Sequence, residues 1–147
     1  MADDKQGTTV RDVKAADFIA AYAAHLKKSG TIAPPEWTTM IKTATHRELG
    51  PSDSDRYFTR AASIARRVYL RPTGVGQLQR VYGGKARRGT RTNKFQKMGT
   101  GHVIRNILQQ FESKGLVEKI GSGRKISKAG QKDLDLIALQ VRYPDDE

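Results

Sequence analysis

The feature that most constrains how this chain can fold is a predicted helix followed directly by a β-hairpin with glycines in its turn. Apolar residues recur at three- and four-residue spacing over 101–114, which predicts an amphipathic helix that ends at Gly115. Residues 116–120 have the composition of a short strand, and Gly121 and Gly123 then predict a turn in which positive φ is required. The chain is therefore predicted to turn back on itself directly after the helix.

The segments after this turn complete a known arrangement. Residues 124–126 predict the returning strand, and Ser127 is placed to cap a last helix with an apolar face formed by Leu134, Ile137, Ala138 and Val141. Helix, strand, turn, strand and helix in this order are typical of a winged helix-turn-helix, in which the helix before the hairpin reads the nucleic acid and the hairpin is the wing. We assign this winged-helix part to residues 99–141.

The preceding part of the chain is predicted to be helical. Apolar spacing and turn residues predict helices over residues 15–29, 36–44, 55–71 and 75–82. In the second of these, Trp37, Met40 and Ile41 are expected to face inward. The fold class is thus mainly α: a single helical domain over residues 1–147, with a helical part at 10–84, a winged helix-turn-helix-like module and a small β-hairpin wing.

Positive charge is concentrated in the middle of the chain. Of the 27 lysines and arginines, 13 lie between residues 56 and 111, a stretch without a single acidic residue; the whole chain has 15 acids and a net charge of +12. A surface that serves only solubility usually mixes both signs, because like charges repel one another. An acid-free stretch of this length predicts binding to a polyanion, since carboxylates would repel its phosphates.

The predicted helix at 55–71 carries a row of arginines beside its apolar face. Four arginines occupy adjoining positions on the helical wheel and a fifth lies on another flank: Arg56, Arg60, Arg67 and Arg71, then Arg66. No acid between residues 56 and 71 can pair with them, and guanidinium groups bind phosphate oxygens through two hydrogen bonds. These five arginines are therefore predicted to contact nucleic-acid phosphates.

Residues 85–98 are predicted to form a basic arm. The arm follows a Gly-Gly pair and combines small polar residues with Phe95 and six cations: Lys85, Arg87, Arg88, Arg91, Lys94 and Lys97. Such a segment suits no apolar core, so we expect it to lack structure alone and to become ordered against nucleic acid. A nuclear-import signal is an alternative interpretation of the same residues, and one stretch can serve both purposes.

Two classes of nucleic acid have to be weighed. A winged-helix DNA-binding regulator would insert polar side chains of the 101–114 helix into the major groove: Arg105, Asn106, Gln109 and Gln110. Arg105 and the wing cations Arg124 and Lys125 are candidate contacts for RNA as well. Because the helix at 55–71 and the arm are also basic, positive charge extends well beyond the reading helix, which favours a folded RNA that touches several sides.

An enzymatic function lacks its catalytic groups. His25, His46 and His102 have no spacing typical of metal ligands, and the acid-free stretch offers no carboxylate to magnesium. His46 could be drawn with Arg47 and Glu48 as a nuclease site, but so could many surface loops. We therefore expect no catalysis, metal, cofactor or small-molecule substrate. With no cysteine and no apolar run long enough for a membrane, an intracellular protein is expected.

Several separate motifs occur in an order that is specific to one family. They lie at residues 18–27 (FIAAYAAHLK), 57–66 (YFTRAASIAR), 69–71, 81–84, 123–127, 130–131 and 133–135. Over about residues 10–141, the chain resembles the eukaryotic and archaeal type of small-subunit ribosomal protein nineteen. Arg60, Arg66 and Arg71 lie inside the matching runs. Many relatives have tryptophan at the position of Arg56 and a Pro-x-His-Phe-like piece at 92–95.

The resemblance implies a helical, winged-helix-like protein in the head of the small ribosomal subunit. It implies that the chain binds small-subunit rRNA, contacts neighbouring head proteins and is needed for maturation of the small-subunit RNA precursor. It further implies a cytoplasmic location on the ribosome, with assembly in the nucleolus or nucleus if the source is eukaryotic.

Overall fold

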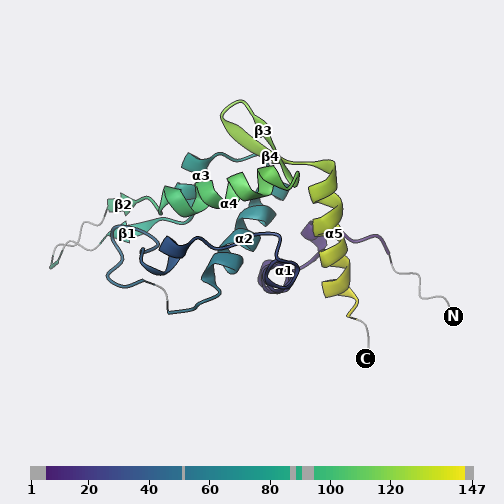
Figure 1. Cartoon of the computed structure of the whole chain (residues 1–147), viewed down its shortest axis with the longest axis horizontal. Coiled ribbons are helices and arrows are strands. Elements are labelled where there is room, and N and C mark those ends of the chain that lie inside the picture. The colour runs from purple at the N-terminus through teal and green to yellow at the C-terminus, as the bar shows by residue number, and fades with distance from the viewer. Residues whose placement is uncertain (1–5, 51, 87–88, 91–94, 145–147) are drawn as a thin grey trace.

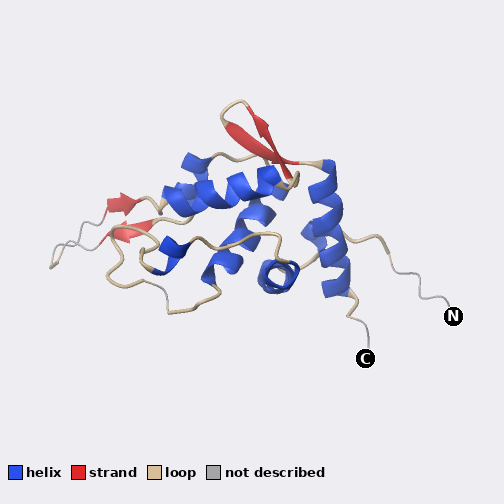
Figure 2. Cartoon of the chain, in the orientation of Figure 1, coloured by secondary structure: helices blue, strands red, loops and turns tan. Residues whose placement is uncertain are grey.

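The computed structural model describes residues 6–50, 52–86, 89–90 and 95–144. In this described part of the chain, five α-helices surround one core, and two β-hairpins project from different sides of it (Figures 1 and 2). The elements follow in the order η1 Val10–Asp12, α1 Ala15–Ser29, η2 Glu36–Thr39, α2 Arg56–Leu70, α3 Val75–Val81, β1 Gly84–Ala86, β2 Phe95–Lys97, α4 Gly101–Ser113, β3 Val117–Ile120, β4 Gly123–Ile126 and α5 Lys128–Arg142. The mainly α class is confirmed.

The first helix matches its sequence prediction at both ends. Phe18, Tyr22 and Leu26 lie on one side of α1 and are buried, which is the consequence of their four-residue spacing. Gly30 ends the helix in the left-handed conformation at φ 67°, and its N–H donates to the Leu26 carbonyl. This apolar face of α1 packs against α2 and α5.

A winged-helix arrangement is built from α2, α3, α4 and the β3–β4 hairpin. Helix α3 packs against α4, and β3 follows α4 after one tight turn (Figure 1). Strands β3 and β4 are antiparallel, with Val117 opposite Ile126. Thr73, between α2 and α3, adds a third strand position: its N–H donates to the Arg124 carbonyl at 3.0 Å, and the Arg124 N–H donates to the Thr73 carbonyl at 2.8 Å.

The last helix is fixed to the wing by its cap. The Ser127 hydroxyl accepts a hydrogen bond from the Gly130 N–H at 3.1 Å, as the sequence predicts for a helix N-terminus. The same hydroxyl donates to the Gly115 carbonyl at 2.6 Å, before β3 begins. Leu134, Ile137 and Ala138 of α5 then join the apolar cluster that also contains the buried faces of α1, α2 and α4. One continuous core favours the single-domain organisation predicted for the chain.

The segment between α1 and α2 differs from its prediction. A helix was expected over 36–44, but only a short 3₁₀ helix, η2, forms there. Met40 was expected to face inward and is 84% exposed, while Trp37 and Ile41 are half-buried. The two prolines before η2 start the turn, but the apolar residues that follow have no facing helix against which to bury.

The basic arm begins and ends as a hairpin. Its two ends form the antiparallel strands β1 and β2, in the register Gly84–Lys97, Lys85–Gln96 and Ala86–Phe95. The cations and small polar residues of this segment predict no structure in the absence of nucleic acid, so these strands differ from the prediction. Backbone pairing defines the strands instead, and the Ala86 side chain of β1 is buried. The hairpin lies at one end of the molecule, away from α5 (Figure 2).

The wing turn requires glycine at only one of the two predicted positions. Gly121 has φ 50°, whereas Gly123 is not among the residues with positive φ. Replacing Gly121 with valine is expected to cost about 1–2 kcal/mol, because a β-branched residue is strained in the left-handed region. Thermal unfolding should show a Tm lower by roughly 2–8 °C. Gly123→Val is the control: its Cβ would meet only ordinary contacts, the nearest at 3.7 Å, so an equal loss in both variants would contradict the explanation.

Candidate nucleic-acid interface

An exposed cluster of arginines lies where the end of α2 meets α3. Arg67 and Arg71, together with Arg80 of α3, line an open cavity of about 320 Å³ whose other walls include Leu70 and Gln77. All three arginine side chains are exposed, and the ion pairs among the described residues involve other cations. This cluster, which we call the arginine surface, offers three guanidinium groups to one side of the protein.

Arg80 completes the arginine surface, although sequence analysis did not select it. Arg80 lies on α3, outside the predicted helix at 55–71 to which the helical wheel applies. The available signal was its place in the acid-free stretch. A second open cavity, of about 690 Å³, shares Thr73, Gln77 and Arg80 with the first and extends to Ile120 of the wing. The arginine surface and the wing therefore lie along one continuous hollow.

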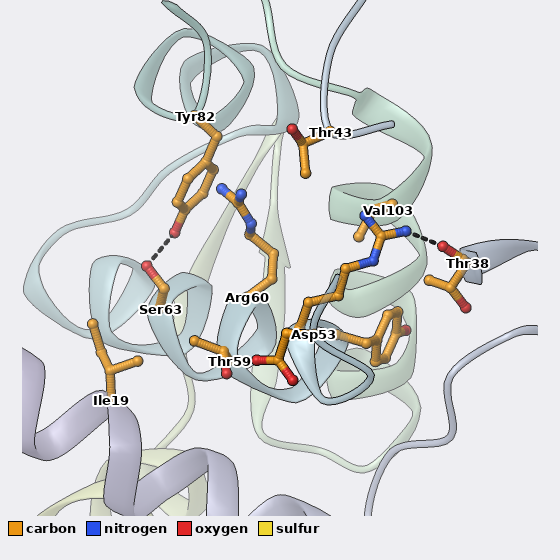
Figure 3. A pocket seen from close by; sticks show the side chains of 11 residues that line it. Ile19, Thr38, Thr43, Asp53, Thr59, Arg60, Ser63, Tyr82 and Val103 are labelled. Atoms are coloured by element: carbon orange, nitrogen blue, oxygen red, sulfur yellow. Dashed lines mark hydrogen bonds between the residues drawn. The ribbon is translucent and has the colours of Figure 1, made fainter. Parts of the chain in front are cut away.

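Arg56 and Arg60, the first members of the predicted row, are held within the protein. One nitrogen of Arg56 donates to the Thr38 and Ile41 carbonyls, and so ties the loop after η2 to α2. Arg60 lies over the ring of Tyr82, with its guanidinium carbon 3.9 Å from the ring centroid (Figure 3). The arginines of the predicted row therefore differ in their surroundings. Arg56 and Arg60 contact neighbouring segments of the protein, whereas Arg67 and Arg71 are exposed.

A pocket of about 510 Å³ opens beside these two inner arginines. Ile19 and Val103 contribute apolar walls, and Tyr82 and Arg60 stand at one side (Figure 3). Burial lowers the pKa of Arg60, and the nearby charges of Arg56 and Arg47 lower it further, against the raising effect of Tyr82. Arginine stays protonated despite such shifts, so the pocket keeps its positive charge.

The remaining candidates of the helical part and reading helix are placed less uniformly. Arg66 is half-buried, and its Nε is buried with no hydrogen-bond partner among the described residues. Arg105 is exposed on α4. Lys85 and Lys97 are exposed on the β1–β2 hairpin. The other arm candidates lie outside the described residues: Arg87, Arg88, Arg91 and Lys94.

The two wing candidates both face a carboxylate of the same chain. The Arg124 Nε lies 3.5 Å from Glu112 Oε2, and only 12% of the Arg124 side chain is exposed. This ion pair joins the wing to α4, so Arg124 has a structural partner that the sequence analysis did not foresee. Lys125 is 4.0 Å from Glu118 on the opposite strand, but about half of its side chain is exposed and can still meet a phosphate.

The amide-rich face of α4 is used inside the protein. The Tyr57 hydroxyl donates to Asn106 Oδ1 at 2.5 Å. Gln110 Nε2 lies within hydrogen-bonding distance of Asn106 Oδ1, the Tyr57 hydroxyl and the Ala33 carbonyl, at 2.7, 2.8 and 2.9 Å. The Ala33 N–H donates to Gln110 Oε1 at 2.9 Å. We call these four residues the α4 amide network; it occupies groups that a DNA reader would need at base edges.

The described part of the chain offers no group of three or more metal-ligating side chains. No helix among the same residues is long and apolar enough to span a bilayer.

Comparisons with known proteins match nearly the whole chain. The family described as ribosomal protein S19e matches residues 9–143. The small ribosomal subunit protein eS19A of Schizosaccharomyces pombe is 48% identical over 143 residues, covering 96% of this chain and 99% of the relative. The eS19B protein of the same yeast is 50% identical over 137 residues, covering 92% and 95%. The eS19 protein of Oryza sativa subsp. japonica is 47% identical over 140 residues, covering 94% and 95%.

Proposed function

Because the chain belongs to the ribosomal protein S19e family, we propose that it binds small-subunit rRNA through its arginine surface and its basic hairpin. Membership makes the protein a structural constituent of the small ribosomal subunit and not an enzyme. Its place in the head of that subunit, its neighbours there and its need in precursor maturation are parts of this proposal. So are a cytoplasmic location on ribosomes and, in a eukaryote, assembly in the nucleolus.

The observation that carries the proposal is the convergence of Arg67, Arg71 and Arg80 on one open cavity. Phosphate oxygens accept paired hydrogen bonds from guanidinium groups, and RNA helices present such oxygens in rows. The arginine surface lies in a stretch with no acid to repel them. The mechanism is one of shape and charge: the apolar core holds the arginines at fixed positions, and these neutralise phosphates where rRNA segments approach each other.

Further candidate contacts extend this surface. Arg66, Arg105, Lys85, Lys97 and Lys125 are proposed to add peripheral contacts to phosphates. Arg87, Arg88, Arg91 and Lys94 are proposed to do the same from the arm. Arg56, Arg60 and Arg124 have partners within the protein, so we do not include them in the arginine surface; they hold neighbouring segments in place and add positive charge.

A DNA-binding regulator is the alternative, and the α4 amide network argues against it. Asn106 and Gln110 would have to leave Tyr57 and Ala33 before they could read a base edge. Each lost bond inside the protein costs free energy, which sequence-specific contacts would have to exceed.

Sedimentation tests the proposed function directly. Lysate from cells that express a tagged chain is washed at about 0.5 M salt, which removes contacts made only with phosphates of loosely bound RNA. We expect the chain to remain in the small-subunit peak, because an integral constituent is also held by shape and by protein neighbours. Release to the top of the gradient, with recovery on chromatin at low salt, would contradict the proposal and support the DNA-binding alternative.

A further inference from the structure

The pocket beside the first half of α2 has the size of a small-ligand site. Its volume of about 510 Å³ falls within the usual range of such pockets, about 300–1,000 Å³. The walls are mainly apolar and come from separate parts of the chain, including Ile19 of α1, Thr59 of α2 and Val103 of α4. The segment between α1 and α2 adds Thr38, Thr43 and Asp53 to the lining.

One side of the pocket presents a planar stack. The Arg60 guanidinium lies 3.9 Å from the centroid of the Tyr82 ring. The Tyr82 hydroxyl shares a hydrogen bond of 2.6 Å with the Ser63 hydroxyl, which fixes the ring against α2 (Figure 3). Unpaired RNA bases stack on aromatic rings and on guanidinium planes. The stack is therefore suited to a flat heterocycle and is in place before a ligand arrives.

Two arginines line the pocket, and neither has an ion-pair partner among the described residues. Arg56 and Arg60 line it, and Arg47 is close enough to influence Arg60. The ion pairs made by the described residues involve Lys27, Arg124, Lys125 and His25 instead. An anionic group on the ligand would relieve the mutual repulsion of these arginines.

Asp53 also lines the pocket, and its carboxylate favours a ligand that carries a hydrogen-bond donor over a simple anion. Its Oδ1 accepts a hydrogen bond from the Asp55 N–H at 2.9 Å. The remaining acceptor sites of the carboxylate can bind the exocyclic amino group of a base, as carboxylates do with cytosine. Adenine, cytosine and guanine carry such a group, and uracil does not.

We propose that this pocket holds one unpaired nucleotide of the small-subunit rRNA, with an amino-bearing base against the Arg60–Tyr82 stack. The phosphates of that nucleotide then lie toward Arg56 at the rim. The inference rests on the proposed rRNA binding and adds to it, because a row of phosphate contacts alone requires no pocket and no unpaired base.

The test fills the pocket with a bulky side chain and measures the chemical reactivity of the rRNA nucleotides. Small subunits are purified from cells with the wild-type chain or with Thr59→Trp, which places an indole in the pocket and removes no charge. The matched control, Gln109→Trp, adds the same side chain at an exposed position of α4. Acylation of 2′-hydroxyls reports nucleotides of every type, and dimethyl sulfate reports unpaired adenine and cytosine. We expect one protected, unpaired A, C or G to gain reactivity by about tenfold with Thr59→Trp alone.

The outcomes separate the two proposals. Loss of the wild-type chain from the subunit in the high-salt gradient would contradict the proposed function itself. A wild-type chain that stays bound, with identical reactivities in both pocket-filled and control subunits, would overturn only the nucleotide pocket. Increased reactivity of a uridine or of a paired nucleotide would overturn it too. If Thr59→Trp keeps the chain out of the subunit, Thr43→Trp fills the pocket from another wall, and the same comparison is made with it.

Discussion

A chain with Arg67, Arg71 and Arg80 all changed to glutamate is expected to be absent from the small-subunit peak while remaining folded. The three side chains are exposed and make no ion pair with any described residue, so the isolated protein should unfold at nearly the wild-type temperature. The loss of three phosphate contacts should also make RNA binding less sensitive to salt. The magnitude of the negative slope of log affinity against log salt concentration is expected to fall by about 2–3. Gradient fractions and salt-dependent binding to small-subunit rRNA provide the measurements.

The control for this variant makes the same change in net charge at positions outside the arginine surface. Lys28, Lys128 and Lys132 are exposed on α1 and α5, and changing them to glutamate gives the same net charge. The long-range attraction to RNA falls equally in both variants, whereas direct contacts are lost only in the first. Equal loss of incorporation in both would mean that the net charge, and not the arginine surface, carries the binding. Arg60 is left out of the experiment because it stacks on Tyr82.

Changing Gly130 to alanine is expected to destabilise the fold more than any surface substitution. A Cβ at this position would lie 2.2 Å from the Leu116 carbonyl oxygen and 2.9 Å from Ile126 Cδ1. The same carbonyl accepts the Ser127 N–H at 3.0 Å, so it cannot move without disturbing the start of α5. Forced overpacking of this kind costs about 3 kcal/mol, and thermal unfolding should then show a Tm lower by roughly 6–12 °C.

Gly76 supplies the matched control for this prediction. It also lies near the start of a helix, α3, and nothing stands within 4 Å of a Cβ added there. Gly76→Ala should raise the free energy of unfolding by up to about 1 kcal/mol, because alanine favours the helix more than glycine does. A Gly130→Ala chain as stable as the wild type would show that α5 can tilt away from β3 without cost.

The long helices could be predicted from the sequence because their signals are local. In α1, the spacing of Phe18, Tyr22 and Leu26 and the stop at Gly30 gave the observed bounds. The wing was predictable for the same reason: Ser127 caps α5 and Gly121 turns the hairpin within a few residues of the elements they define.

The functions of polar side chains were harder to predict, because they depend on residues that are distant in sequence. A helical wheel placed Arg56 and Arg60 in one row with Arg67, but it carried no information about the loop after η2 or about Tyr82. Likewise the periodicity of α4 marked Gln110 as polar and outward. Its partner Ala33 follows α1, and only the folded chain brings the two together.

The same limit applies to the short elements. Strands β1 and β2 form by pairing with each other, and the residue pattern within each strand does not predict this pairing. Met40 has the side chain of a core residue and lies exposed because the tertiary structure offers no neighbour at that point. In both cases the outcome depends on residues outside the local sequence window.

The contribution of α5 to the core has a consequence for the order in which a nascent chain can mature. Phe18 and Tyr22 of α1 belong to the same apolar cluster as Leu134 and Ile137 of α5, which are synthesised much later, and the two helices are in contact. Domain closure must therefore wait until nearly all of the matching region has left the exit tunnel. The apolar cluster that joins α1, α2 and α4 is therefore complete only after α5 has emerged.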